Sequence, residues 1–125
     1  MVDIARTVAG GPTAAWELLA DTRQWPRWGP TVAAVEADPP VVVAGSRGRV
    51  RTSVGVWLPF EVTEVDAGHR WAWRVAGVPA TGHRVEATPA GTRVVFEVPV
   101  LAAPYALVCL EALRRIDRLL RTDGG

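Results

Sequence analysis

The feature that most constrains this sequence is a series of short alternating segments joined by tight turns and followed by one amphipathic segment. Polar and apolar residues alternate within residues 47–54, 60–63, 70–76, 80–87 and 92–100, which predicts strands with one covered face and one face in water. Turns such as Asp66-Ala67-Gly68 separate these segments. Short strands joined by tight turns predict an antiparallel meander.

The C-terminal segment has the clearest helical periodicity. Pro104 suits a first helical turn, and from there apolar residues recur three and four positions apart. That stripe comprises Tyr105, Val108, Cys109, Ala112, Leu113, Ile116, Leu119 and Leu120. The opposite face is charged, and the pairs Glu111–Arg115 and Asp117–Arg121 have the favourable i,i+4 order. We therefore predict one long helix that opens at Pro104.

The N-terminal part predicts the remaining elements. Residues 4–8 alternate as a strand, Pro12 opens a helix that runs to Ala20, a second short helix ends near Pro26, and residues 30–35 form a strand. The result is an α+β protein with a seven-stranded antiparallel sheet. One long helix cannot fill the concave face of a strongly twisted sheet of that size, so either side chains fill the remainder or a ligand cavity persists.

Composition excludes several classes of function. The chain has 125 residues, which predicts a single domain over 1–125. Its 14 basic residues are all arginines, and they are balanced by 13 acidic residues, so no one-signed surface for nucleic acid is expected. The single cysteine, Cys109, excludes an intrachain disulfide and Cys-rich metal sites, and we predict no metal and no cofactor.

Two further features concern location. No basic region leads into an apolar stretch at the start of the sequence, so we see no signal peptide and expect a cytoplasmic protein. Residues 98–110 carry no charge, but this run contains Pro99 and Pro104 and is shorter than the roughly 20 residues of a membrane-spanning helix. We expect no membrane span.

Four local strings, in order along nearly the whole chain, resemble the START-like (SRPBCC) superfamily in its polyketide cyclase/dehydrase and lipid-transport branch. The strings are Ala15-Trp16-Glu17-Leu18-Leu19-Ala20-Asp21 with Trp25-Pro26-Arg27-Trp28, Phe60-Glu61-Val62-Thr63-Glu64-Val65-Asp66, Arg70-Trp71-Ala72-Trp73, and Gly91-Thr92-Arg93-Val94. The resemblance implies a helix-grip fold, in which a curved sheet wraps around the C-terminal helix with a tunnel between them. Members include aromatic polyketide cyclases and carriers of hormones and lipids, so the resemblance implies a cavity without specifying a reaction.

Strand parity predicts which side chains face that cavity. Trp71 and Trp73 share one face of their strand and His83 points inward from the next; a hairpin centred on Val78 would place Trp73 directly opposite His83. Burial would keep His83 neutral. Three roles stay open for it: supporting the core by bonding a backbone carbonyl or Tyr105, anchoring a polar group of a ligand, or acting as a general acid–base catalyst.

The other candidate ligand contacts are Phe60, Phe96 and Val98 on the covered face, Tyr105 at the helix start, and Trp28 and Trp57 near the rim. Glu64 has inward parity, but we expect a bulge to turn it outward, which leaves His83 without a catalytic partner. Leu107 and Leu110 fall off the helix stripe and predict a possible homodimer contact.

The leading hypothesis is therefore binding of a small hydrophobic molecule, aromatic or polycyclic, in an internal cavity between the sheet and the C-terminal helix. The first alternative is a polyketide cyclase/dehydratase-type enzyme in which His83 assists the reaction. The second is a protein-interaction module that uses the apolar start of the C-terminal helix.

Overall fold

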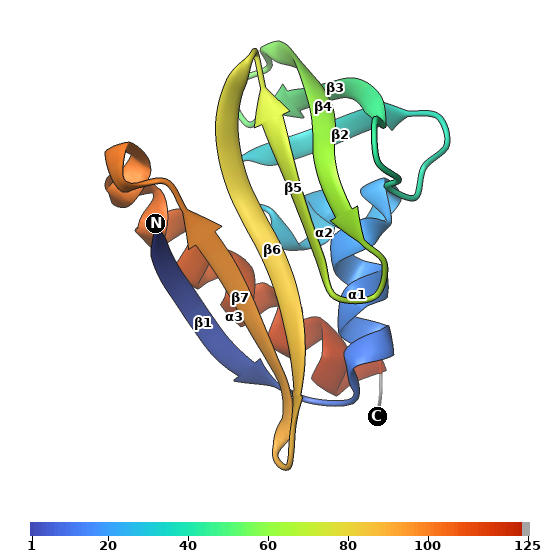
Figure 1. Cartoon of the computed structure of the whole chain (residues 1–125), viewed down its shortest axis with the longest axis vertical. Helices are drawn as coiled ribbons and strands as arrows, with labels where there is room; N and C mark the ends of the chain where they lie inside the picture. Colours follow the sequence, from blue (N-terminus) through green and yellow to red (C-terminus); the bar gives the residue numbers. More distant parts are fainter. Residues whose placement is uncertain (124–125) are drawn as a thin grey trace.

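The computed structural model describes residues 1–123 as a curved antiparallel sheet with helices on its concave side (Figure 1). The strands are β1 (Val2–Val8), β2 (Val32–Ala37), β3 (Arg47–Thr52), β4 (Trp57–Asp66), β5 (Arg70–Val75), β6 (Val78–Thr88) and β7 (Gly91–Val98). The helical elements are α1 (Pro12–Ala20), the 3₁₀ turn η1 (Thr22–Gln24), α2 (Trp25–Trp28), the 3₁₀ segment η2 (Val100–Tyr105) and α3 (Ala106–Asp123). The predicted α+β helix-grip architecture is confirmed.

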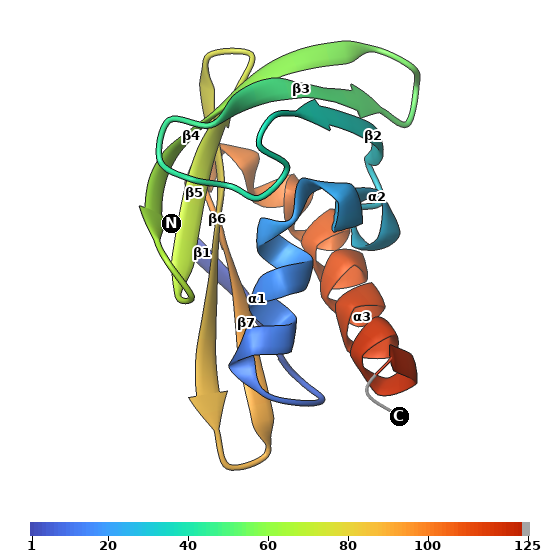
Figure 2. The same cartoon turned by 90° about the vertical axis from the view of Figure 1, so that its right-hand side faces the viewer.

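The seven strands form one sheet in the order β1-β7-β6-β5-β4-β3-β2. Strands β2 to β7 are a meander of antiparallel neighbours, and β1 returns to pair with β7. Figure 2 shows α1 and α3 on the same side of the sheet, with the β3–β4 end curling over them. Both edges of the sheet are therefore open, and one face is covered by helices.

Strand parity and helix periodicity explain this layering. In β7, Val94, Phe96 and Val98 are buried beneath the helices, as their parity predicts. In α3, Cys109, Leu113 and Ile116 are each 1% exposed or less and form the stripe that faces the sheet. No helix among residues 1–123 is long and apolar enough to cross a membrane.

A buried carboxylate fixes α3 against the N-terminal strand. Asp117 is 3% exposed; it accepts hydrogen bonds from the Arg6 guanidinium, from the Ala9 backbone N–H and from Arg121 Nε, all at 3.1–3.2 Å. Burial alone would raise the pKa of Asp117, but these donors outweigh it and hold the pKa below its usual value. The Asp117–Arg121 pair was predicted, whereas the long-range contacts to Arg6 and Ala9 were not.

Two predicted helix boundaries are wrong, and proline is involved in both. Pro26 does not end the second short helix but lies in the first turn of α2, where its missing N–H would have no intrahelical partner. Pro104 lies inside η2, and α3 begins two residues later at Ala106. Tyr105 is therefore the last residue of η2, ahead of the first turn of α3.

Candidate functional site

The concave face of the sheet is filled by aromatic side chains. Trp25 of α2 stacks on Trp71 of β5 with 5.2 Å between ring centroids and an interplanar angle of 8°. Tilted and edge contacts link this pair, Phe60 and Trp73 to one another, at 5.1–5.6 Å between centroids. Trp25 and Trp71 are at most 1% exposed. Side chains therefore fill most of the concave face, which is one of the two outcomes that the sequence predicts.

His83 lies within this aromatic cluster, but opposite a different tryptophan from the one predicted. Val75 pairs with Val78, so the β5–β6 turn is the two-residue Ala76-Gly77, and a register shift follows between Ala72 and Arg74. Both turn residues have positive φ, 52° and 78°, as a tight hairpin turn requires. His83 consequently faces Trp71 and stacks on it, with 4.0 Å between ring centroids.

A short hydrogen-bond chain ends at Nε2 of His83. Trp73 Nε1 donates to Thr81 Oγ1 at 3.2 Å, and Thr81 Oγ1 lies 2.9 Å from His83 Nε2. Among residues 1–123, the other imidazole nitrogen, Nδ1, has no hydrogen-bond partner, and the same holds for Trp71 Nε1. Burial lowers the pKa of His83 to about 3, and an interaction with the backbone of Trp71 opposes this shift in part. His83 is therefore neutral at pH 7.

The burial of His83 predicts that the free energy of unfolding depends on pH below neutrality. The pKa is about 3 in the folded protein and near 6.5 in the unfolded chain, so the unfolded chain binds the proton first as the pH falls. The free energy of unfolding therefore has its full contribution from neutral His83 above pH 6.5. It decreases as the pH falls toward 3, by up to about 1.4 kcal/mol per pH unit.

Urea unfolding at pH 7 and pH 5.5 measures the effect above the range where carboxylates titrate. The wild type should lose about 1 kcal/mol, His83→Gln should lose almost none, and His69→Gln, which changes an exposed histidine, should behave as the wild type. Equal losses in wild type and His83→Gln would contradict the assignment.

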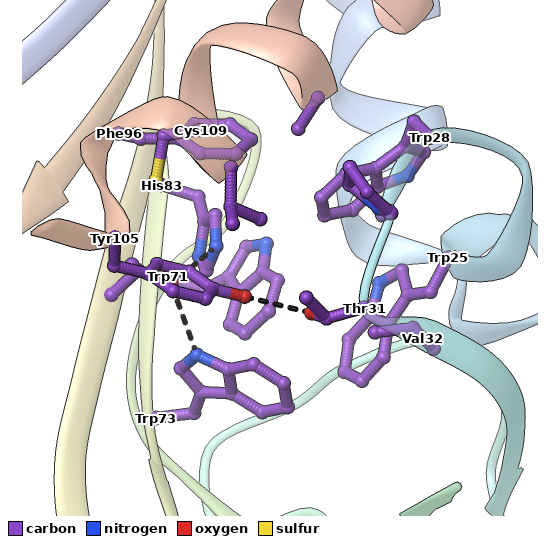
Figure 3. A pocket seen from close by; sticks show the side chains of 15 residues that line it. Trp25, Trp28, Thr31, Val32, Trp71, Trp73, His83, Phe96, Tyr105 and Cys109 are labelled. Carbon is purple, nitrogen blue, oxygen red and sulfur yellow. Dashed lines mark hydrogen bonds between the residues drawn. The ribbon is translucent and has the colours of Figure 1, made fainter. Parts of the chain in front are cut away.

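A small interior cavity of about 40 Å³ remains between this cluster, α2 and α3 (Figure 3). Its walls include Trp28, Trp71, His83, Phe96 and Cys109. Burial raises the pKa of the Cys109 thiol to about 11, so it is a neutral wall group. An engineered apolar cavity that holds benzene has a volume of about 150 Å³. The interior cavity has room for a group of one or two heavy atoms and none for a ring.

A larger apolar groove of about 400 Å³ lies next to the interior cavity. Its walls come from β2 to β6 and η2, and the apolar ones include Val50, Leu58, Trp73, Val75, Val78 and Ala102. The polar wall groups are the hydroxyls of Thr31, Thr52, Thr81 and Tyr105. Five residues line both spaces, namely Thr31, Val32, Trp73, Thr81 and Tyr105.

Tyr105 and Thr31 close the boundary between the two spaces. Their hydroxyls lie 2.8 Å apart in a hydrogen bond that spans the pocket (Figure 3). Burial raises the pKa of Tyr105, so its hydroxyl stays protonated at pH 7. Tyr105 is nevertheless 39% exposed, so its ring has a path to solvent.

Not every predicted ligand contact lines these spaces. Trp28, Trp71, Trp73, His83, Phe96 and Tyr105 line the interior cavity. Phe60 and Val98 are instead buried core residues outside both spaces, and Trp57 lies on the outer face with the Arg49 guanidinium 4.3 Å from its ring centroid. The parity of Trp57 matches that of Pro59 and Glu61, the outward residues of β4, which explains its position.

Glu64 points away from both spaces. A register shift between Val62 and Glu64 turns it outward, as the bulge prediction required, and its carboxylate pairs with Arg70. Arg70 also binds Glu97, which is buried on the outer face beside Gly82; a Cβ at residue 82 would lie 2.5 Å from Glu97 Oε1. Hydrogen bonds from Arg70 hold the pKa of Glu97 below its usual value. Glu64 and Glu97 therefore form their ion pairs on the outer face of the sheet.

Sequence reasoning found Tyr105 but missed the threonines of the site. Thr31 and Thr81 both line the boundary between the two spaces, yet threonine is common in strands and gives no signal by itself. The inward parity that Thr81 shares with His83 was the one usable indication. Within residues 1–123, no group of three or more His, Cys, Asp or Glu side chains could hold a metal ion.

Several solved structures share this fold at low sequence identity. The chain is similar to protein MLL2253 from Mesorhizobium loti, with a TM-score of 0.78 and 14% identity over 97% of this chain and 96% of that one. It is also similar to an AHSA1-like protein from Aeromonas hydrophila, with a TM-score of 0.73 and 16% identity over 98% and 93%. These identities support the shared fold alone.

A further similarity is to DynU16, a protein of the dynemicin biosynthetic locus. Its TM-score is 0.70 and its identity 22%, over 98% of this chain and 47% of that one. No functionally curated protein matches the sequence. The family model described as polyketide cyclase / dehydrase and lipid transport matches residues 1–118, and the chain therefore belongs to this family.

Proposed function

We propose that this protein binds a small, neutral aromatic molecule in the apolar groove. The observation that carries the proposal is the groove itself: about 400 Å³ of space with apolar walls and only a few hydroxyls. Sites for small molecules have this size and this character, with few polar groups that fix orientation. The family description, which names polyketide cyclases and lipid transport, supports a hydrophobic ligand.

The aromatic body of the ligand would lie in the groove and not in the internal tunnel expected from the sequence. The tryptophans of the interior leave about 40 Å³, so an aromatic ring fits only in the groove. Trp73 and Val75 would supply flat contact area. The absence of a charged side chain from the described walls of the groove favours a neutral ligand over an anion or cation.

The test uses prodan, a neutral naphthyl ketone whose fluorescence brightens and shifts to the blue in apolar sites. Saturable binding to the wild type is expected. Val75→Trp places a bulky ring in the groove and should weaken binding at least about tenfold. Arg74→Trp introduces the same ring at the neighbouring exposed position and should leave affinity unchanged. Saturable binding that both variants leave intact would place the dye elsewhere and reject the groove.

A polyketide cyclase/dehydratase-type reaction is the second candidate, favoured by the family description. His83 and Tyr105 are the polar titratable groups of the combined walls. A histidine with a pKa of about 3 is a weak general base at pH 7, so catalysis would rest on folding the substrate and excluding water. Turnover of a linear polyketide that survives in His83→Gln would remove His83 from any mechanism.

The interaction hypothesis concerns a different surface. Leu107 and Leu110 are 75% and 46% exposed at the start of α3, which is compatible with a homodimer contact but does not identify a partner. Sedimentation velocity of Leu107→Glu would show a change of mass if this contact held two copies together. Dimerisation and a cytoplasmic location both stay predictions.

A further inference from the structure

Two buried ring nitrogens beside the interior cavity lack a hydrogen bond of standard geometry. Trp71 is fully buried and His83 is 2% exposed, and neither Trp71 Nε1 nor His83 Nδ1 has a hydrogen-bond partner among the described residues. Leaving a buried donor unpaired is unfavourable, and native proteins rarely do so without a functional reason. The remaining tryptophans of the cavity wall are satisfied: Trp25 and Trp28 donate to the carbonyls of Leu19 and Leu18, and Trp73 donates to Thr81.

The hydrogen-bond chain on the other side of His83 is compatible with a proton on Nδ1. Thr81 Oγ1 accepts from Trp73 Nε1, so its own proton is free to be donated to His83 Nε2. A neutral imidazole that accepts at Nε2 carries its proton at Nδ1. In this tautomer Nδ1 is a donor, like the indole nitrogen of Trp71.

We propose that Trp71 Nε1–H and His83 Nδ1–H together recognise a carbonyl oxygen of the ligand whose aromatic body lies in the groove. This inference rests on the proposed function and adds the ligand class, an aromatic ketone or aldehyde. The two rings are stacked 4.0 Å apart, and a carbonyl group matches the small volume of the interior cavity. A neutral pair of donors favours a neutral carbonyl over a carboxylate, whose charge would be buried without a counterion.

Tyr105 is the side chain that has to move for the oxygen to enter. It lines both spaces, and its hydroxyl points across the pocket to a hydrogen bond with Thr31 (Figure 3). The two nitrogens are sealed from solvent in this arrangement. Rotation of one partly exposed side chain is fast compared with ligand binding, so the closed wall is no barrier to recognition.

The experiment compares acetylnaphthalene with isopropenylnaphthalene, which have the same shape but differ by C=O against C=CH₂. The wild type should bind the ketone about tenfold more tightly than the alkene, measured by calorimetry. Trp71→Phe removes one donor and should abolish most of this preference. Trp28→Phe changes another wall of the same cavity, one whose nitrogen is already bonded to Leu18, and should keep the preference even if both affinities fall.

A second measurement on the wild type makes the test independent of variant stability. The Trp71 indole proton resonance should move downfield with the ketone and stay in place with the alkene, and the imidazole ¹⁵N shifts should show His83 protonated at Nδ1. Equal binding of the two compounds with an unmoved Trp71 resonance would overturn the carbonyl inference while the proposed groove stands. Failure of both compounds to bind would overturn the inference together with the proposed function.

Discussion

Trp25→Ala is expected to lower the free energy of unfolding by about 3–5 kcal/mol, the range for removing a large aromatic side chain from a packed core. Trp25 is 1% exposed, stacks on Trp71 and contacts Phe60 and Trp73. Its Nε1 also donates to the Leu19 carbonyl at 2.8 Å, so the substitution leaves that acceptor unpaired. The aromatic cluster would lose the ring at its centre.

Trp57→Ala is the matched control, because it removes the same side chain from the outer face of the sheet. Trp57 is half-buried there against Arg49, and its loss should lower the free energy of unfolding by no more than about 1 kcal/mol. Urea denaturation measures both. A larger loss for Trp57→Ala than for Trp25→Ala would contradict the assignment of the core to the concave face.

Asp117→Asn should lower the free energy of unfolding by about 2 kcal/mol, because the buried carboxylate loses its charge-assisted hydrogen bonds to Arg6 and Arg121, whose side chains are 45% and 66% exposed. The carboxylate accepts from Arg6, the Ala9 N–H and Arg121, and it connects α3 to the end of β1. An amide retains the shape but loses the charge and replaces an acceptor with a donor. The contact of α3 with the sheet edge would be the first to weaken.

Glu111→Gln provides the control on the same helix. Glu111 pairs with Arg114 and Arg115 at the surface, where such pairs contribute at most about 0.5 kcal/mol. Hydrogen exchange of the β1 amides adds a local readout, and faster exchange is expected in Asp117→Asn alone. Similar losses of stability in the two variants would contradict the structural role given to Asp117.

The elements were predictable from the sequence because their periodicity is strong. Alternation in residues 92–100 and the three-to-four spacing of the C-terminal stripe identified β7 and α3. Parity also placed Trp71 and His83 on the covered face, and the expected bulge at Glu64 is present. These properties depend on local sequence, where one face of a strand or helix differs from the other.

The register of the site could not be predicted in the same way. Parity fixes the face on which a side chain lies but not its partner on the next strand. Because the turn is Ala76-Gly77 and the register shifts after Ala72, His83 lies opposite Trp71 and not opposite Trp73 as predicted. Whether the concavity was filled depended on the volumes of side chains from five elements, which no local pattern records. The groove appeared in the structure because η2 and the β5–β6 hairpin, distant in sequence, share its walls.

The six tryptophans provide the most direct measurement of the central claim, the binding of a small aromatic molecule in the groove. Their indole N–H resonances can be followed individually while prodan is added to the wild-type protein. The resonance of Trp73, which lines the groove and the interior cavity, should shift most and saturably. The resonances of Trp57 on the outer face and of Trp16, which lines a separate surface pocket near α1, should not move. A saturable shift at Trp16 or Trp57 with Trp73 unchanged would contradict the account.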